Sequence, residues 1–282
     1  MIAGFRSEFR KFFSTRMWWV MLLIAVAYVG GTAAIMAFLF DFTIDSSPEL
    51  DTISLEGFID LSQTIYSLGA TFGYVFPVLV GALSVTGEYR HQTVTPTFLA
   101  DPNRVRVLVT KLLAAIPLGL LYGVVTIGGT VALGGGVLAL LDRPTGLTET
   151  STWLYLGRSV LALTVWALVG IGLGALLKNQ VAAIIVAIVF TQFLEPMLRV
   201  IPAMTGRPLE FLNYLPGAVS DSIVGKSMFM GMNVSLTEDA GQVDQLAGYS
   251  LLSPGLAVAV LAGYALVFAI AGYFTTWRKD VS

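Results

Sequence analysis

Two long apolar runs separated by only three polar residues occupy positions 154–204, which read LYLGRSVLALTVWALVGIGLGALL, then KNQ, then VAAIIVAIVFTQFLEPMLRVIPAM. Each run exceeds the roughly 20 mostly apolar residues that a helix needs to cross the hydrocarbon core of a bilayer. A connection of three residues makes two such helices antiparallel neighbours. The stretch therefore predicts transmembrane helices at 154–177 and 181–204, joined by Lys178, Asn179 and Gln180.

The rest of the chain has the same character. Hydrophobic residues make up 56% and charged residues 12% of its 282 positions, against about 25% charged residues in a soluble domain, and the mean hydropathy is +0.79. Four further apolar runs, at 17–40, 64–85, 112–141 and 254–277, are long enough to span. The predicted fold is an all-α integral membrane protein with six transmembrane helices.

Prolines and glycines predict irregularities within these spans. Pro117 and two glycine clusters loosen the third span and permit a tilt or a break. Pro196 and Pro202 are expected to break the fifth span in its outer part. Small-residue pairs at 119/123 and 170/174 have the spacing of close helix contacts, and local packing is their preferred interpretation.

Basic residues predict the orientation, because cytoplasmic flanks retain Lys and Arg. One side of the six-span layout holds eleven of the 16 basic residues. These are Arg6, Arg10, Lys11, Arg16, Arg90, Arg104, Arg106, Lys111, Lys178, Arg278 and Lys279. The other side, whose first loop at 41–60 carries acidic residues and no base, holds the remaining five. Both termini are therefore expected in the cytoplasm.

Several function classes are excluded by composition and motif. A net charge of -2 with so few charged residues provides no basic face for nucleic acid. With no cysteine and one histidine, His91, no metal site is expected. The triplet Gly225-Lys226-Ser227 is not a phosphate-binding loop, because Ser220 stands where that motif needs glycine. No catalytic residue, metal or cofactor is expected in this chain.

The first 16 residues form a segment of their own. Phenylalanines recur at helical spacing, as at Phe5 and Phe9, while Arg6, Arg10 and Lys11 occupy the rest of the helical wheel. This pattern predicts an amphipathic helix at 1–16 that lies in the headgroup plane of the lipid bilayer. The alternative is that these charges only set topology.

The predicted cytoplasmic link between the second and third spans is the most informative segment. Residues 87–111 read GEYRHQTVTPTFLADPNRVRVLVTK. A short helix is expected at 94–101, with Phe98 and Leu99 as its apolar contacts, and Asp101-Pro102-Asn103 predicts the following turn. A short helix held between two spans is suited to docking into a groove on a cytoplasmic partner.

This ordered set resembles the permease subunits of ABC transporters of the ABC-2 type, also called the type V exporter fold. The resemblance rests on the amino-terminal helix, on Gly87-Glu88-Tyr89-Arg90 with the residues after it, on the six-span layout and on Leu215-Pro216-Gly217. It implies a coupling helix that contacts a separate ATPase subunit, which binds ATP and Mg. The coupling residues would be Glu88, Arg90, Thr93, Phe98, Leu99, Pro102, Arg104 and Lys111.

Further implications of the resemblance concern the outer side and the partners. A second copy of the permease, or a homologous permease, would complete the pathway. The outer segment at 205–253 would contain short helices that follow the fifth span. This segment is expected either to gate the exit of the substrate or to form a lid without a gating function, and the two alternatives are equal.

Four polar residues fall inside or near the spans, where ionisable groups usually face protein or water. These are Arg158, Gln192, Glu195 and Arg199. Glu195 and Arg199 are four apart on one helix face, and with Arg158 they are expected to form an ion network. A structural clamp is the preferred interpretation, and a direct substrate role is the alternative.

The resulting hypothesis is an exporter subunit in the plasma membrane of a bacterial cell. Its expected pathway is largely apolar and suits an amphipathic, lipid-like or drug-like substrate. The pathway residues would be Tyr66, Thr71, Tyr74, Phe190 and Thr191. A membrane-embedded enzyme and a secondary transporter are the alternatives, but the former needs a carboxylate or histidine pair inside the spans, and the latter needs repeats that the sequence does not reveal.

Overall fold

The computed structural model describes residues 2–46, 61–205, 209–225 and 252–277, and within them every regular element is helical. Within these ranges, six helices are long and apolar enough to cross a membrane. They are Met17–Thr43, Leu61–Arg90, Arg104–Leu140, Thr150–Leu176, Gln180–Pro202 and Pro254–Trp277, spans 1 to 6 in chain order. The chain is therefore an all-α, multi-pass membrane protein, as its hydropathy predicts.

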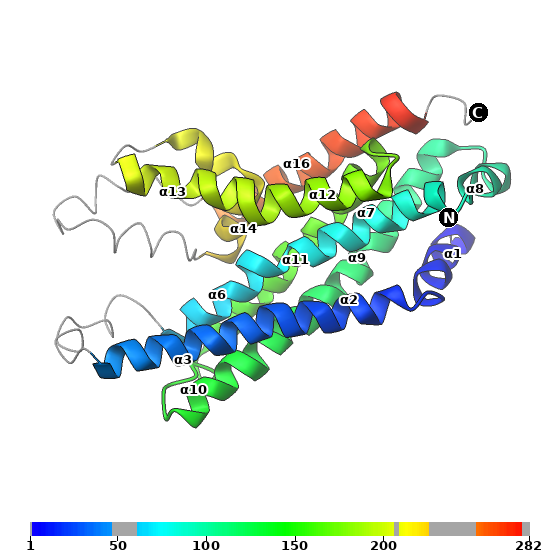
Figure 1. Cartoon of the computed structure of the whole chain (residues 1–282). Helices are drawn as coiled ribbons and strands as arrows, with labels where there is room; N and C mark the ends of the chain where they lie inside the picture. The colour runs from blue at the N-terminus through cyan, green and yellow to red at the C-terminus, as the bar shows by residue number, and fades with distance from the viewer. Residues whose placement is uncertain (1, 47–60, 206–208, 226–251, 278–282) are drawn as a thin grey trace.

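The spans run along one common direction (Figure 1). Helix α1 (Ile2–Phe13), the short helix α8 (Val94–Ala100) and the last turn of span 6 gather at one end, named here the α8 end. Helix α10 (Gly136–Leu140), which completes span 3, lies at the opposite end.

Several spans are made of shorter helical segments. Span 1 comprises α2 (Met17–Ala25), a π-helical turn at Val26–Gly30 and α3 (Gly31–Ser46). Span 2 comprises α6 (Leu61–Gly73) and α7 (Val75–Arg90). Its interruption at Tyr74 has a local cause: the ring of Pro77 would clash with the carbonyl of residue 73, one turn earlier.

The irregularity of span 3 lies at one of the predicted glycine clusters, and that of span 5 ends two residues before Pro196. Helix α9 (Arg104–Thr130) continues through Pro117, and the deviation is a π-helical turn at Val131–Gly135, where glycines are dense. Span 5 joins α12 (Gln180–Val189) to α13 (Glu195–Thr205) through a π-helical turn at Phe190–Leu194. Pro202 lies inside α13 and does not end it.

Spans 2 and 3 are longer than the apolar runs that predict them. Span 2 extends from Leu61 to Arg90, beyond the predicted 64–85, and α9 begins at Arg104, ahead of the predicted 112. Asn103 starts α9 by accepting a hydrogen bond from the amide of Arg106 at 3.1 Å. Hydropathy alone underestimates the length of these two helices, because both continue into charged residues at the α8 end.

Helix α11 (Thr150–Leu176), which is span 4, forms the centre of the bundle and packs against α7, α9 and α16 (Pro254–Gly272). The most apolar windows of spans 2 and 4 are 89% and 78% buried, against 33%, 22% and 28% for spans 1, 5 and 6. The outer three spans therefore carry the apolar surface that faces away from the bundle.

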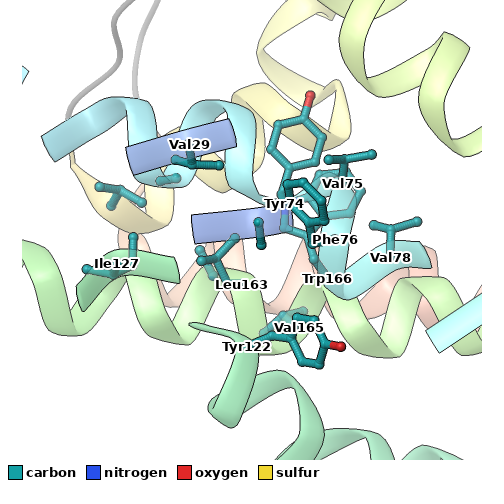
Figure 2. Close-up of a cluster of buried hydrophobic side chains, with 14 of the residues drawn as sticks. Val29, Tyr74, Val75, Phe76, Val78, Tyr122, Ile127, Leu163, Val165 and Trp166 are labelled. Carbon is teal, nitrogen blue, oxygen red and sulfur yellow. The ribbon is translucent and has the colours of Figure 1, made fainter. Parts of the chain in front are cut away.

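Large side chains fill the middle of the bundle (Figure 2). The rings of Tyr74 and Trp166 stack with centroids 4.5 Å apart and an interplanar angle of 15°. Tyr74 also donates a hydrogen bond to the carbonyl of Thr191 at 2.8 Å. These contacts tie the interruption of span 2 to spans 4 and 5.

Glycines allow α11 to approach its neighbours closely. Gly119 and Gly123 of α9 face Thr164 and Val160 of α11, and Gly170 and Gly174 of α11 face the backbone of α7. A Cβ atom at any of these positions would meet backbone atoms at 3.0 Å or less. The predicted role of both glycine pairs in local packing is confirmed.

We expect Gly170→Ala to lower the stability of the protein by about 1–3 kcal/mol, because the added methyl group would overlap the carbonyl of Val78 and force two helices apart. The matched control is Gly157→Ala on the same helix, where a Cβ atom has nothing within 4 Å. That change should leave stability unchanged or slightly raised. Thermal unfolding of the two purified variants in detergent compares them, and equal melting temperatures would contradict the packing role.

Candidate functional site

Helix α8 is fixed to the bundle through one of its two central apolar residues. The ring of Phe98 packs edge-on against Trp277, the last residue of span 6, with centroids 5.4 Å apart. The guanidinium of Arg104 lies 5.2 Å from the centre of the Phe98 ring, and its Nη1 donates a hydrogen bond to the carbonyl of Trp277. Phe98 is therefore held within the chain, where the sequence predicts that it contacts a partner.

The other central apolar residue, Leu99, points outward. Its side chain is 78% exposed, on a helix that follows α7 by three residues and precedes α9 by three. The predicted helix at 94–101 is confirmed to within one residue. The predicted turn at Asp101-Pro102-Asn103 is an irregular connection between α8 and α9, in which the amide of Asn103 donates to Asp101 Oδ1 at 3.0 Å. Arg90, Thr93 and Pro102 are also exposed. The α8 end thus presents a leucine and polar residues on a short, rigidly anchored helix.

Four charged residues meet beside α8, and we name them the four-charge cluster: Glu8, Lys11, Glu88 and Lys111. Lys111, whose side chain is fully buried, lies 2.7 Å from Glu8 and 2.9 Å from Glu88. Lys11 lies 3.0 Å from Glu8 and 2.6 Å from Glu88. Each lysine contacts both carboxylates, so the cluster joins α1 to α7 and α9.

The protonation of the α1 residues favours this docking at neutral pH. Burial by itself raises the pKa of Glu8, but Lys111 and Lys11 outweigh it, and the pKa falls below its ordinary 4.5. Burial lowers the pKa of Lys11, while Glu88 and Glu8 together raise it above 10.5. The contribution of Glu8 to the stability of the folded protein is present above pH 4.5 and is lost as the pH falls through the lowered pKa of Glu8. The contribution of Lys11 to the same stability is present below pH 10.5 and is lost as the pH rises through the raised pKa of Lys11.

This cluster changes the interpretation of three predicted residues. Glu88 and Lys111 were expected among the residues that couple the chain to an ATPase, but they are buried and bind each other. Lys11 was expected on the polar face of an interfacial helix, but it binds carboxylates. Glu8 was missed, although an acid on a predicted basic helix is a signal for a buried cation nearby.

The remaining predicted residues of α1 lie on its outer side. Arg6 and Arg10 are exposed, and the ring of Phe5 contacts that of Phe9 in a tilted arrangement, with centroids 4.9 Å apart. Phe12 turns inward and packs edge-on against Tyr122 of α9 at 6.4 Å. Helix α1 thus has a polar side and a phenylalanine stripe, and its charged residues dock it on α7 and α9.

The residues predicted to line a pathway lie at the interior of the single chain. Tyr66, Thr71, Tyr74 and Thr191 are at most 4% exposed, and Phe190 is half-buried. Tyr66 donates a hydrogen bond to the carbonyl of Thr145 at 2.8 Å. These side chains form packed helix contacts in this structure, and their role in a pathway remains a prediction.

The predicted clamp among polar residues of the spans involves other partners than expected. The guanidinium of Arg199 forms an ion pair with Asp221 of α14 (Pro216–Val224), and both side chains are at most 4% exposed. Glu195 Oε1 accepts hydrogen bonds from the amides of Gly217 and Ala218, at 2.5 and 3.1 Å, at the start of α14. Both residues therefore fasten α14 to span 5.

The predicted participation of Arg158 is wrong. No hydrogen bond or ion pair joins it to Glu195 or Arg199 among the described residues, and its guanidinium lies against Gly225 at the end of α14. Gln192 accepts a hydrogen bond from the hydroxyl of Tyr28 at 3.1 Å and so joins spans 1 and 5. Asp221 was missed because it follows span 5 in the sequence, although an aspartate in the apolar run after Leu215-Pro216-Gly217 needs a cation when buried.

Part of the predicted outer segment lies outside the described residues. Within the described part, α14 and a 3₁₀ turn at Glu210–Tyr214 follow span 5, as the sequence predicts for short helices there. Positions 226–251, which include the apolar stretch at 228–232 where a further short helix is predicted, are not among the described residues. In the described ranges, no group of His, Cys, Asp and Glu side chains is placed to hold a metal ion.

Comparison with known proteins does not identify a family for this chain. No protein-family model matches the chain, and no curated protein sequence matches it. The fold and the sites therefore define a class: a multi-pass, all-α membrane protein of six spans, with a short anchored helix and a buried charge cluster at one end.

Proposed function

We propose that this chain is the membrane-spanning permease subunit of an ATP-driven exporter of the ABC-2 type. A separate ATPase subunit would bind ATP and Mg and dock on α8, and this chain would catalyse no reaction itself. The observation that carries the proposal is the exposed Leu99 on a short helix whose two ends continue into spans 2 and 3. This arrangement is suited to receiving a partner's movement and transmitting it to the spans.

The anchoring of α8 supports a rigid transmission. Phe98, Arg104 and Trp277 tie α8 to span 6, while Lys11 contacts Thr97 at 3.4 Å and Glu88 at 2.6 Å. A displacement of α8 would therefore move α1, α7, α9 and span 6 together. ATP-driven closure of the ATPase would supply that displacement.

The remaining parts of the proposal follow from the six-span layout and the basic bias. The α8 end would face the cytoplasm of a bacterial cell, with both termini on that side. Two permeases, identical or homologous, would form the pathway between them. The substrate would be amphipathic, lipid-like or drug-like, because the spans offer mainly apolar surface.

We expect Leu99→Asp to abolish most of the attachment to the ATPase. An adjacent ATPase gene would supply the partner for co-expression. The substitution removes an apolar anchor and places a charge in a desolvated groove of the ATPase. Loss of a buried anchor costs about 2 kcal/mol or more of binding free energy, which corresponds to roughly a 30-fold loss of affinity. Recovery of the ATPase with the permease from membranes, and substrate-stimulated ATP hydrolysis, measure the effect.

The matched control is Leu140→Asp, which places the same charge at another exposed leucine, 85% exposed at the end of α10 away from α8. It should retain the ATPase. If Leu99→Asp retains it as well, at equal permease levels, α8 is only a linker and the proposed coupling fails.

A further inference from the structure

A cavity of about 360 Å³ lies at the α8 end, under α1 and between α2, α7, α9 and α11. This volume falls within the range of about 300–1,000 Å³ that is usual for small-molecule sites. Its apolar wall includes Phe12, Trp18, Met21, Leu83, Leu118 and Tyr122. The four-charge cluster forms its polar side, and the exposed His91 also borders it.

The cations of this cavity are already saturated. The ammonium of Lys11 donates to Glu8, Glu88 and Thr97, at 3.0, 2.6 and 3.4 Å. The ammonium of Lys111 contacts Glu8, Glu88 and the carbonyl of Ser84, at 2.7, 2.9 and 3.5 Å. An ammonium has three donors, so an anionic ligand could bind either lysine only by breaking an existing contact.

The oxygens of the cavity, in contrast, retain free lone pairs. Both lysines bind Oε1 of Glu88, whereas Oε2 has no partner within the described part of the chain and is not sealed from solvent. The hydroxyl of Tyr122 donates to the carbonyl of Trp18, and that of Ser84 donates to the carbonyl of Gly81, at 2.7 Å each. Their oxygens can still accept. These acceptors offer partners to a ligand that donates hydrogen bonds.

We propose that this cavity binds an amphiphilic amine. The protonated amine would pair with Oε2 of Glu88 in a charge-assisted hydrogen bond, and the apolar body would lie against the wall of α2 and α9. The site goes beyond the proposed export function, because binding there needs neither the ATPase nor transport.

Three probes that share one chain length test the headgroup preference: decylamine, decanol and decanoate. Each is titrated into the full chain in nanodiscs of zwitterionic lipid, and the melting temperature is followed. A ligand that binds only the folded state raises stability in proportion to its occupancy. We expect decylamine to bind at least 10-fold more tightly than decanol, and decanoate to bind least.

Two variants place the effect in this cavity. Ala114→Leu adds volume on the lining while it keeps all four charges, and it should weaken decylamine binding at least 10-fold. Glu88→Gln keeps the shape but removes the negative charge, and it should reduce the preference for decylamine over decanol to less than 3-fold. If Ala114→Leu does not fold, Glu88→Gln alone decides.

Three outcomes would overturn the proposal. They are equal shifts with all three probes, a preference for decanoate, and a decylamine preference that survives both variants. The last would assign the binding to the lipid-facing surface. None of these results depends on attachment of the ATPase, so a failure here leaves the proposed export function standing.

Discussion

Asp221→Asn should lower the stability of the protein by about 3–5 kcal/mol, because it leaves the buried guanidinium of Arg199 without its carboxylate. Arg199 is 2% exposed, so water cannot replace the lost charge. The hydrogen bonds from the amides of Gly217 and Ala218 to Glu195 would still join α14 to span 5. A fall in melting temperature in detergent, with loss of the protein during purification at the extreme, measures the effect.

The control for this prediction is Asp101→Asn, which also neutralises an aspartate paired with arginine. The Asp101 and Arg106 side chains are 32% and 50% exposed and 3.6 Å apart. Exposed pairs contribute about 0–1 kcal/mol, so Asp101→Asn should leave the melting temperature almost unchanged. Equal effects of the two substitutions would show that burial of the Arg199 pair contributes nothing.

The second large effect is expected from Lys111→Met, again about 3–5 kcal/mol. The substitution preserves the apolar stem but leaves Glu8 and Glu88 sharing only Lys11. Two carboxylates in a buried site repel each other when one cation must serve both. Thermal unfolding and the protease sensitivity of α1 report the loss, since Lys111 forms the ion pair that joins α1 to α9.

Charge balance provides a test of this mechanism. The double variant Lys111→Met/Glu8→Gln leaves one lysine and one glutamate, so it should recover part of the stability that Lys111→Met loses. Arg106→Met on the same helix removes an exposed pair and should cost less than about 1 kcal/mol. A double variant less stable than Lys111→Met would refute charge balance as the cause.

The polar contacts show where prediction from the sequence ends. Lys111 and Glu8 are 103 positions apart, and Arg199 and Asp221 are 22 positions apart. Helix periodicity relates residues three or four positions apart, and it gave Glu195 with Arg199 on one face. It could not show that α14 folds back to meet both residues. The sequence therefore predicted Arg158 as their partner in an ion network.

The α8 segment was partly predictable, because some of its features are local and others depend on distant residues. Its helix and turn are local features, set by residues 94–103, and both were predicted. The direction in which Phe98 points depends on Trp277, which lies at the far end of the chain. Only a tertiary contact could separate the anchored Phe98 from the exposed Leu99.

The sequence by itself determined the six spans, since the thickness of the hydrocarbon core fixes how long an apolar helix must be. It also indicated two glycine pairs, 119/123 and 170/174, that mediate close packing, because without a Cβ atom a helix can approach its neighbour. The tertiary structure alone decided which charges meet and where a cavity remains. Buried charges must find partners wherever the fold brings them together, and those partners come from helices that are distant in the sequence.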